Sequence, residues 1–195
     1  MLFINGWASN ASVWGDLPAL AAGQCYDLAA DKALQDYRQK IPARLEQHKI
    51  ETLVGWSLGG MVALEIAAAF PQQVKRLILL GTTAKFTVDA SYPHGLPLAV
   101  VKQLARKVQR DPLAAQEQFY PLMFSAHEQE AGRLFQGKMA QSVMTSNQAL
   151  LQEGLDFLAA QDLRSLLPKI TARTQIIHGL EDAICPFGAA EYLAA

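Results

Sequence analysis

The stretch Val54-Gly55-Trp56-Ser57-Leu58-Gly59-Gly60 places one serine between glycines, at the point where a predicted strand gives way to a predicted helix. Apolar residues 52–54 precede the turn, and the helix-forming residues 61–66 follow it. In the pattern G-x-S-x-G, the serine occupies a strained strand-to-helix turn, and the glycines leave room for the crossing backbone. The stretch therefore predicts that Ser57 is a nucleophile that a base and a substrate can both reach. The alternative is that Ser57 merely caps the helix.

Short apolar runs alternate with longer helical patterns along the rest of the chain. This alternation is typical of buried parallel strands that are joined by crossover helices. Strands are predicted at residues 2–4, 24–28, 52–54, 76–80 and 174–177, and helices at 11–22, 34–48 and 60–70. The pattern favours an α/β fold, in which helices flank both faces of a mainly parallel sheet.

The regular alternation stops after Gly81. Residues 85–161 contain amphipathic helical patterns but no convincing strand. Because 195 residues suit one domain, we expect a helical lid insertion (85–161) between a first part of the core (1–84) and a second part (162–195). Such an insertion commonly forms a wall of a binding site, and the alternative is additional helical packing.

The chain is nearly neutral, with 17 Lys and Arg residues against 18 Asp and Glu residues. No overall field would therefore attract nucleic acid or an anionic membrane. Cys25 and Cys185 lie far apart and outside any CxxC or Cys/His cluster, which favours free thiols in a reducing compartment. The sequence shows no export signal and no apolar run long enough to span a membrane, so we expect a cytoplasmic protein.

A serine nucleophile that attacks an ester needs hydrogen-bond donors for the oxyanion. One donor is commonly the amide after the nucleophile, here that of Leu58, and the other lies in the loop after an earlier strand. The loop Asn5-Gly6-Trp7-Ala8 follows the first predicted strand, so the backbone N–H of Trp7 is the candidate second donor. The alternative is an ordinary strand exit with Trp7 as a core aromatic.

Three motifs resemble those of the α/β-hydrolase superfamily: FINGWASNASVW (3–14), VGWSLGG (54–60) and IIHGLEDAICP (176–186). The insertion and the segment LDFLAAQDLRSLLPKI (155–170) resemble those of the biotin-pathway pimeloyl-[acyl-carrier protein] methyl ester carboxylesterases. The resemblance implies an α/β-hydrolase fold and a serine carboxylesterase that works through an acyl-enzyme without a cofactor or metal. General esterases, thioesterases and lactonases with the same machinery are alternatives, as is a catalytically silent binding protein of this fold.

The resemblance also assigns roles to individual residues. Ser57 matches the nucleophile, Asp182 the acid of the triad, and Leu58 and Trp7 the backbone donors of the oxyanion hole. Trp7 and Phe119 match residues that line the acyl pocket. The alternatives are a simple turn residue for Asp182 and a residue in the core of the lid for Phe119.

The superfamily order of the triad is Ser, Asp and then His, yet no histidine follows Asp182. The resemblance implies that His178 is structural, and we expect His48 on the surface. His94 and His127 lie in the insertion, from which a histidine reaching Ser57 would be unusual. We therefore expect that terminal elements are missing and that the base histidine lies beyond residue 195; the alternative is a natural short form of the protein.

Three cations in the insertion, Lys102, Arg106 and Arg110, are spaced four residues apart, which aligns them along one face of a helix. The resemblance implies that this stripe docks an acidic acyl carrier protein. The alternative is an ordinary solvated helix face.

Overall fold

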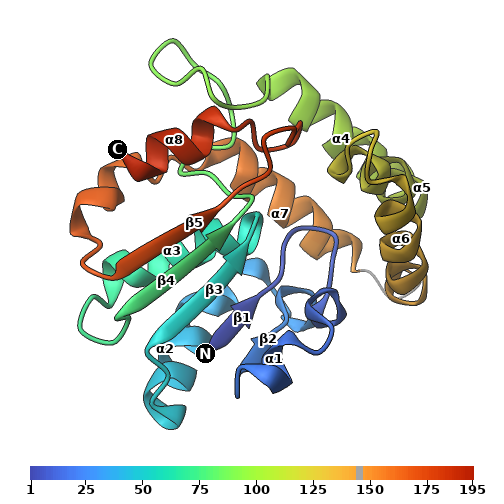
Figure 1. The fold of residues 1–195 in the computed structure, drawn as a ribbon. Helices are drawn as coiled ribbons and strands as arrows, with labels where there is room; N and C mark the ends of the chain where they lie inside the picture. Colours follow the sequence, from blue (N-terminus) through green and yellow to red (C-terminus); the bar gives the residue numbers. More distant parts are fainter. Residues whose placement is uncertain (144–146) are drawn as a thin grey trace.

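Five parallel strands form one sheet in the centre of the computed structural model, which describes residues 1–143 and 147–195 (Figure 1). The strand order is β2-β1-β3-β4-β5. The strands are β1 (Leu2–Ile4), β2 (Gln24–Tyr26), β3 (Thr52–Trp56), β4 (Arg76–Leu80) and β5 (Arg173–Ile177). The chain adds β2 on one side of β1 and then crosses to add β3 on the other side. The carboxyl ends of β1 and β3 therefore flank a switch point, where ligand sites of α/β sheets commonly form.

Successive side chains of each strand pack on opposite faces of the sheet, as the two-residue period of a strand requires. Leu53 of β3 belongs to the larger hydrophobic core, whereas the next residue, Val54, packs in a smaller one with Trp14. The larger core contains buried residues of α2 (Tyr37–His48) and α3 (Leu58–Ala69). Helices thus cover the sheet on both faces, which confirms the predicted α/β architecture.

The single helix predicted at 11–22 is wrong, because this segment forms two short helices. These are η1 (Ala11–Trp14) and α1 (Leu17–Leu20). Gly15 lies between them with φ 53°, a left-handed conformation that glycine adopts without the steric cost other residues meet. The pattern of apolar residues continues across the break and so did not reveal it.

The other predicted elements differ from the structure mainly at their ends. The strand predicted at 24–28 ends at Tyr26, because the Asp27 side chain accepts a hydrogen bond from the Ala29 amide and caps η2 (Leu28–Ala30). The helix predicted at 34–48 begins with a 3₁₀ turn, η3 (Leu34–Asp36), before α2.

The segment between β4 and β5 is helical. It contains α4 (Leu98–Arg110), α5 (Pro112–Phe119), η4 (Tyr120–Met123), α6 (Gln129–Val143) and α7 (Gln148–Ala160). In the described part of 85–161, β pairing between backbone segments is limited to isolated bridges, and no strand forms. Helix α7 packs along α4, and its residues Leu155 and Leu158 enter the larger core. No helix within the described ranges has the length and apolar character needed to cross a membrane.

The two ends of this helical segment are joined where they leave the sheet. The Leu163 amide donates to the Ala84 carbonyl at 2.8 Å. Asp162 forms ion pairs with Lys85 at 3.1 Å and with Arg164 at 2.6 Å. From this junction, η5 (Arg164–Lys169) leads into β5, which α8 (Gly188–Ala194) follows.

Candidate active site

Ser57 lies on a strained turn between β3 and α3. Its backbone angles are φ 53° and ψ −119°, a region that residues with a side chain rarely adopt. The Ser57 amide donates to the Leu80 carbonyl at 3.0 Å, and the Thr82 hydroxyl donates to the Ser57 carbonyl at 2.6 Å. The side chain makes no capping hydrogen bond to α3, so the alternative role as a helix cap is not seen.

The glycines around Ser57 are required by close backbone contacts. A Cβ atom at Gly55 would lie 2.5 Å from the Gly59 carbonyl oxygen. A Cβ atom at Gly59 would lie 2.5 Å from the Asn5 carbonyl oxygen and even closer to that of Ile4. Strand β3, helix α3 and the exit of β1 therefore approach so closely that only glycine fits, as the motif predicts.

The loop of residues 5–9 folds against Ser57. A Cβ atom at Gly6 would lie 3.2 Å from the Ser57 Cβ. The buried Asn5 side chain donates to the Ser9 carbonyl at 2.6 Å and accepts from the Leu28 amide at 3.0 Å. Asn5 therefore ties the loop after β1 to the loop after β2.

The sequence predicts that the backbone N–H groups of Leu58 and Trp7 form the oxyanion hole. Leu58 is the first residue of α3, where an N–H group has no partner within the helix. The backbone N–H of Trp7 likewise has no partner among the backbone hydrogen bonds of the described residues. Neither group therefore donates to another backbone carbonyl within the part of the chain that the structure describes.

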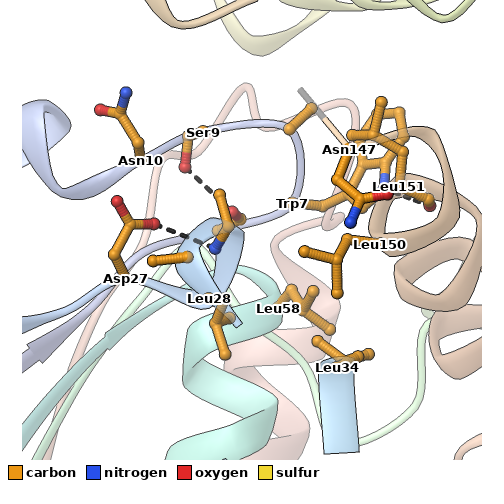
Figure 2. Close-up of a pocket in the computed structure, with 14 residues that line it drawn as sticks. Trp7, Ser9, Asn10, Asp27, Leu28, Leu34, Leu58, Asn147, Leu150 and Leu151 are labelled. Atoms are coloured by element: carbon orange, nitrogen blue, oxygen red, sulfur yellow. Dashed lines mark hydrogen bonds between the residues drawn. The ribbon is translucent and has the colours of Figure 1, made fainter. Parts of the chain in front are cut away.

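Trp7 and Phe119 pack against each other beside Ser57. Their rings meet edge to face, with centroids 4.8 Å apart. The Trp7 indole donates from Nε1 to the Leu151 carbonyl at 2.8 Å (Figure 2). Trp7 is thus buried in the core, as the alternative interpretation expects, and it also lines the Ser57 cavity.

The Asp182 carboxylate faces the same cavity as Ser57. Its Oδ1 atom accepts hydrogen bonds from the amides of Ile184 at 2.9 Å and Cys185 at 2.8 Å. These bonds fix the orientation of the carboxylate. The Oδ2 atom accepts no hydrogen bond from a described residue and lies 3.6 Å from His178 Nε2. Asp182 therefore presents one oxygen that is held and one that can receive a further donor.

One small cavity of about 60 Å³ is lined by four of the residues selected from the sequence: Ser57, Asp182, Trp7 and Phe119. Ile184 also lines this cavity and, with Trp7 and Phe119, an adjoining apolar pocket of about 160 Å³ between α4, α5 and α7. The sequence did not single out Ile184, although it lies within the third quoted motif. Trp7, Phe119 and Ile184 therefore line both the Ser57 cavity and the apolar pocket of the insertion.

Trp7 also lines a larger hollow of about 350 Å³ (Figure 2). Its walls come from the loops after β1 and β2 and from the start of α7, and Leu58 lines it as well. Trp7 thus lines both this hollow and the Ser57 cavity. No motif in the sequence indicated it, because its walls come from segments far apart along the chain.

No histidine within the described ranges lines the Ser57 cavity. His178 hydrogen-bonds through Nε2 to the Cys185 carbonyl at 2.6 Å, and only 2% of its side chain is exposed. His94 packs against Tyr92, with ring centroids 5.4 Å apart, whereas His48 and His127 are exposed. His178 is therefore nearly buried beside Asp182, and none of the four histidines lines the cavity of Ser57.

The side chains of Lys102, Arg106 and Arg110 are exposed on α4, whereas Val101 and Val108 are buried. The predicted stripe is therefore present on the outer face of the insertion. Helix α4 also lines the apolar pocket with its inner face.

The sequence matches the α/β-hydrolase fold family over residues 5–195. It is 30% identical to a pimeloyl-[acyl-carrier protein] methyl ester esterase of Aromatoleum aromaticum, over 100% of this chain and 84% of that protein. A protein of the same name from Nitrosomonas europaea is 28% identical, over 99% of this chain and 81% of its own length.

Solved structures of the same fold resemble the chain over nearly its whole length. An esterase from Exiguobacterium antarcticum superposes with a TM-score of 0.79 at 24% identity, covering 99% of this chain and 78% of its own. The enol-lactonase from Burkholderia xenovorans LB400 gives a TM-score of 0.81 at 19% identity, covering 99% and 77%. At these identities the likeness establishes the fold.

Proposed function

Because the chain belongs to the α/β-hydrolase fold family, we propose that it is a serine carboxylesterase that cleaves the methyl ester of a pimeloyl chain bound to an acyl carrier protein. The observation that carries the proposal is the placement of Ser57 on a strained turn, in one cavity with the carboxylate of Asp182. The named relatives from Aromatoleum and Nitrosomonas support the substrate.

In the proposed reaction, the Ser57 hydroxyl attacks the ester carbonyl and loses its proton to a general base. The amides of Leu58 and Trp7 donate to the resulting oxyanion. The tetrahedral intermediate collapses as the alcohol leaves with the proton from the base, and an acyl-enzyme remains. Water then attacks this ester with help from the same base and releases the acid.

Asp182 orients the base and stabilises its cationic form. Its free Oδ2 is the atom suited to this task, because two amides already hold Oδ1. We propose that the base is a histidine outside residues 1–195. The position of Asp182 after β5 supports this assignment, because an imidazole that donates to Oδ2 would lie in the cavity that Ser57 lines.

The acyl chain fits the apolar pocket that begins at Trp7 and Phe119. The pocket walls are mainly aliphatic and aromatic, so burying a methylene chain there would contribute about 0.8 kcal/mol for each CH₂. Lys107 and Gln118 line the same pocket and hydrogen-bond to each other at 2.8 Å. They provide polar groups at one wall of an otherwise apolar pocket.

The outer face of α4 is the proposed contact for the carrier protein. Lys102, Arg106 and Arg110 form no ion pair with another described residue, so their charges are available to an acidic partner. The same helix lines the acyl pocket, which brings the proposed partner close to the proposed substrate.

The direct test compares two methyl esters of pimelate, one attached to acyl carrier protein and one to a small thiol. The natural full-length protein should release methanol from both, with a higher kcat/KM for the carrier-bound ester. Equal rates would argue for a general small-ester esterase, and no release from either would contradict the proposed reaction.

A second candidate function is a binding protein that retains the pocket but does not cleave esters. The observation that favours it is the lack of a histidine among the described residues lining the Ser57 cavity. Such a protein would bind the carrier-bound ester, shown by calorimetry, and leave it intact.

A further inference from the structure

The loop of residues 5–9, which carries the proposed Trp7 donor, is held by a side chain of the insertion. The Tyr120 hydroxyl donates a hydrogen bond of 2.8 Å to the Ala8 carbonyl oxygen. Tyr120 is the first residue of η4, and only 2% of its surface is exposed. The insertion therefore reaches the backbone directly beside the proposed oxyanion donor.

Ala8 has an unusual conformation that needs external support. Its φ angle is 57°, in the left-handed region that is unfavourable for a residue with a Cβ atom. A strained residue of this kind persists only where surrounding contacts determine its conformation. The hydrogen bond from Tyr120 fixes the direction of the Ala8 carbonyl, and with it the turn that follows Trp7.

Tyr120 is suited to a permanent donor role. Burial raises the pKa of its phenol to about 12, so the hydroxyl keeps its proton throughout the neutral range. The Gln116 amide donates to the same oxygen at 3.3 Å, which leaves the phenol proton for Ala8. The Ala8 carbonyl can only accept, so the direction of this bond is unambiguous.

A second contact ties the same loop to the insertion. The Trp7 indole donates to the Leu151 carbonyl of α7 at 2.8 Å. A Cβ atom at Gly154 would lie 2.5 Å from Trp7 Cδ1, so the indole occupies the space where α7 lacks a side chain. Glycine is costly inside a helix, and this contact gives it a structural reason.

Other side-chain hydrogen bonds of the loop do not connect it to the insertion. Asn5 donates to the Ser9 carbonyl, and the Ser9 hydroxyl donates to the Gly6 carbonyl at 2.9 Å. Both bonds close the loop on itself without connecting it to the insertion. Among described residues, the side-chain hydrogen bonds between this loop and the insertion are therefore those of Tyr120 and Trp7.

We propose that Tyr120 is a positioning residue of the oxyanion hole, whose hydroxyl holds the Ala8 carbonyl so that the Trp7 amide points toward the ester bound at Ser57. The inference rests on the proposed function, because it assumes that the Trp7 amide binds the oxyanion. It makes the insertion part of the catalytic apparatus as well as the wall of the acyl pocket. Tyr120 acts through the loop and does not itself contact the reacting atoms.

The test replaces Tyr120 by phenylalanine, which removes the hydroxyl and keeps the ring. Tyr92→Phe is the matched control, because Tyr92 is also buried and its hydroxyl hydrogen-bonds to the Thr83 hydroxyl at 2.7 Å, away from the loop. For both variants of the full-length protein we would measure kcat and KM on p-nitrophenyl butyrate and the affinity for a trifluoromethyl ketone. The ketone forms a tetrahedral adduct with a serine and so depends on the oxyanion hole.

Amide hydrogen exchange at residues 5–9 gives a readout that does not depend on activity. In Tyr120→Phe we expect faster exchange there, a kcat about 10- to 100-fold lower and a similar loss of ketone affinity, with KM changed by less than about 2-fold. In Tyr92→Phe we expect the wild-type values. An unchanged kcat and exchange in Tyr120→Phe, or equal losses in both variants, would overturn the proposal.

The exchange measurement also separates the two proposals. A wild-type protein without turnover or ketone binding would contradict the proposed function, and with it the catalytic meaning of Tyr120. Faster exchange in Tyr120→Phe would then still establish that the hydroxyl holds the loop. If the wild type turns over substrate and Tyr120→Phe has the same kcat, ketone affinity and exchange rates, the positioning role alone is rejected.

Discussion

The turn that carries Ser57 and the insertion that covers it are built in different ways. Backbone atoms and missing side chains hold the turn, since Gly55 and Gly59 allow β3, α3 and β1 to approach closely. Side chains form the insertion's part of the site, chiefly Phe119 and Tyr120. The difference indicates that changes to the turn should abolish the reaction, whereas changes to the insertion should tune it.

Among the substitutions that should leave the fold intact, the largest expected effect on the reaction comes from Asp182→Asn. The Asn side chain keeps an oxygen for the amides of Ile184 and Cys185, so we expect the free energy of unfolding to change by less than about 1 kcal/mol. The kcat should fall by about 10⁴-fold, because the amide no longer selects and stabilises the required form of the base. Steady-state kinetics and urea unfolding would check this, with the exposed Asp16→Asn as control. Equal activity in both variants would remove Asp182 from the mechanism.

Gly59→Ala tests the turn itself. The added Cβ would meet the carbonyls of Ile4 and Asn5, neither of which can move without disturbing β1 or the loop after it. We expect the free energy of unfolding to fall by about 3 kcal/mol or more, with loss of activity. Gly137→Ala in α6 is the control, because its Cβ would meet no atom within 4 Å, and it should be neutral or slightly stabilising. Chemical denaturation would measure the free energy of unfolding of both variants. A loss confined to Gly59→Ala would show that the close backbone contacts at Gly59 cause it.

Reversing the charges of Lys102, Arg106 and Arg110 tests the outer face of the insertion. With all three changed to glutamate, kcat/KM for a carrier-bound ester should fall by about 10-fold or more at low salt, since long-range attraction is replaced by repulsion. The rate with a small free ester should stay unchanged. The loss should shrink as added salt screens the charges. The same reversal at the exposed Lys75, Lys169 and Arg173 is the matched control, and an equal loss there would reject a specific docking face.

The smallest effect is expected at the junction between insertion and core. The hydrogen bond from Arg164, together with Lys85, lowers the pKa of Asp162. A carboxylate with a lowered folded-state pKa stabilises the fold above its unfolded value near pH 4, and this contribution is lost as pH falls through the folded-state pKa. Asp162→Asn should therefore lower the free energy of unfolding by at most about 1 kcal/mol at pH 7, since the pair is partly exposed. The difference from wild type should shrink when urea unfolding is repeated at pH 3.

The parts of the molecule that local sequence determines were predictable. The strands β1 and β4 have the predicted bounds, and the strand-turn-helix around Ser57 follows from the spacing of its glycines. The prediction of one helix at 11–22 was wrong because a single left-handed residue, Gly15, interrupts an otherwise helical pattern. Periodicity reports which residues face the core and contains little information about one backbone angle.

Contacts between distant segments were not predictable in the same way. Tyr120 and Ala8 are 112 residues apart, and no sequence motif links the two positions. The 350 Å³ hollow lined by Trp7 likewise combines the loops after β1 and β2 with α7. Such features arise when the insertion packs on the sheet, so they depend on tertiary structure and not on a local pattern.

The most direct test of the central claim is labelling of the natural full-length protein with a fluorophosphonate probe, followed by intact-mass and peptide analysis. Such a probe reacts with a serine only where a base and an oxyanion hole activate it. We predict one adduct, located on Ser57, that is absent in a folded Ser57→Ala variant. A wild-type protein that remains unlabelled, or a Ser57→Ala variant labelled equally well, would contradict the assignment of Ser57 as the nucleophile.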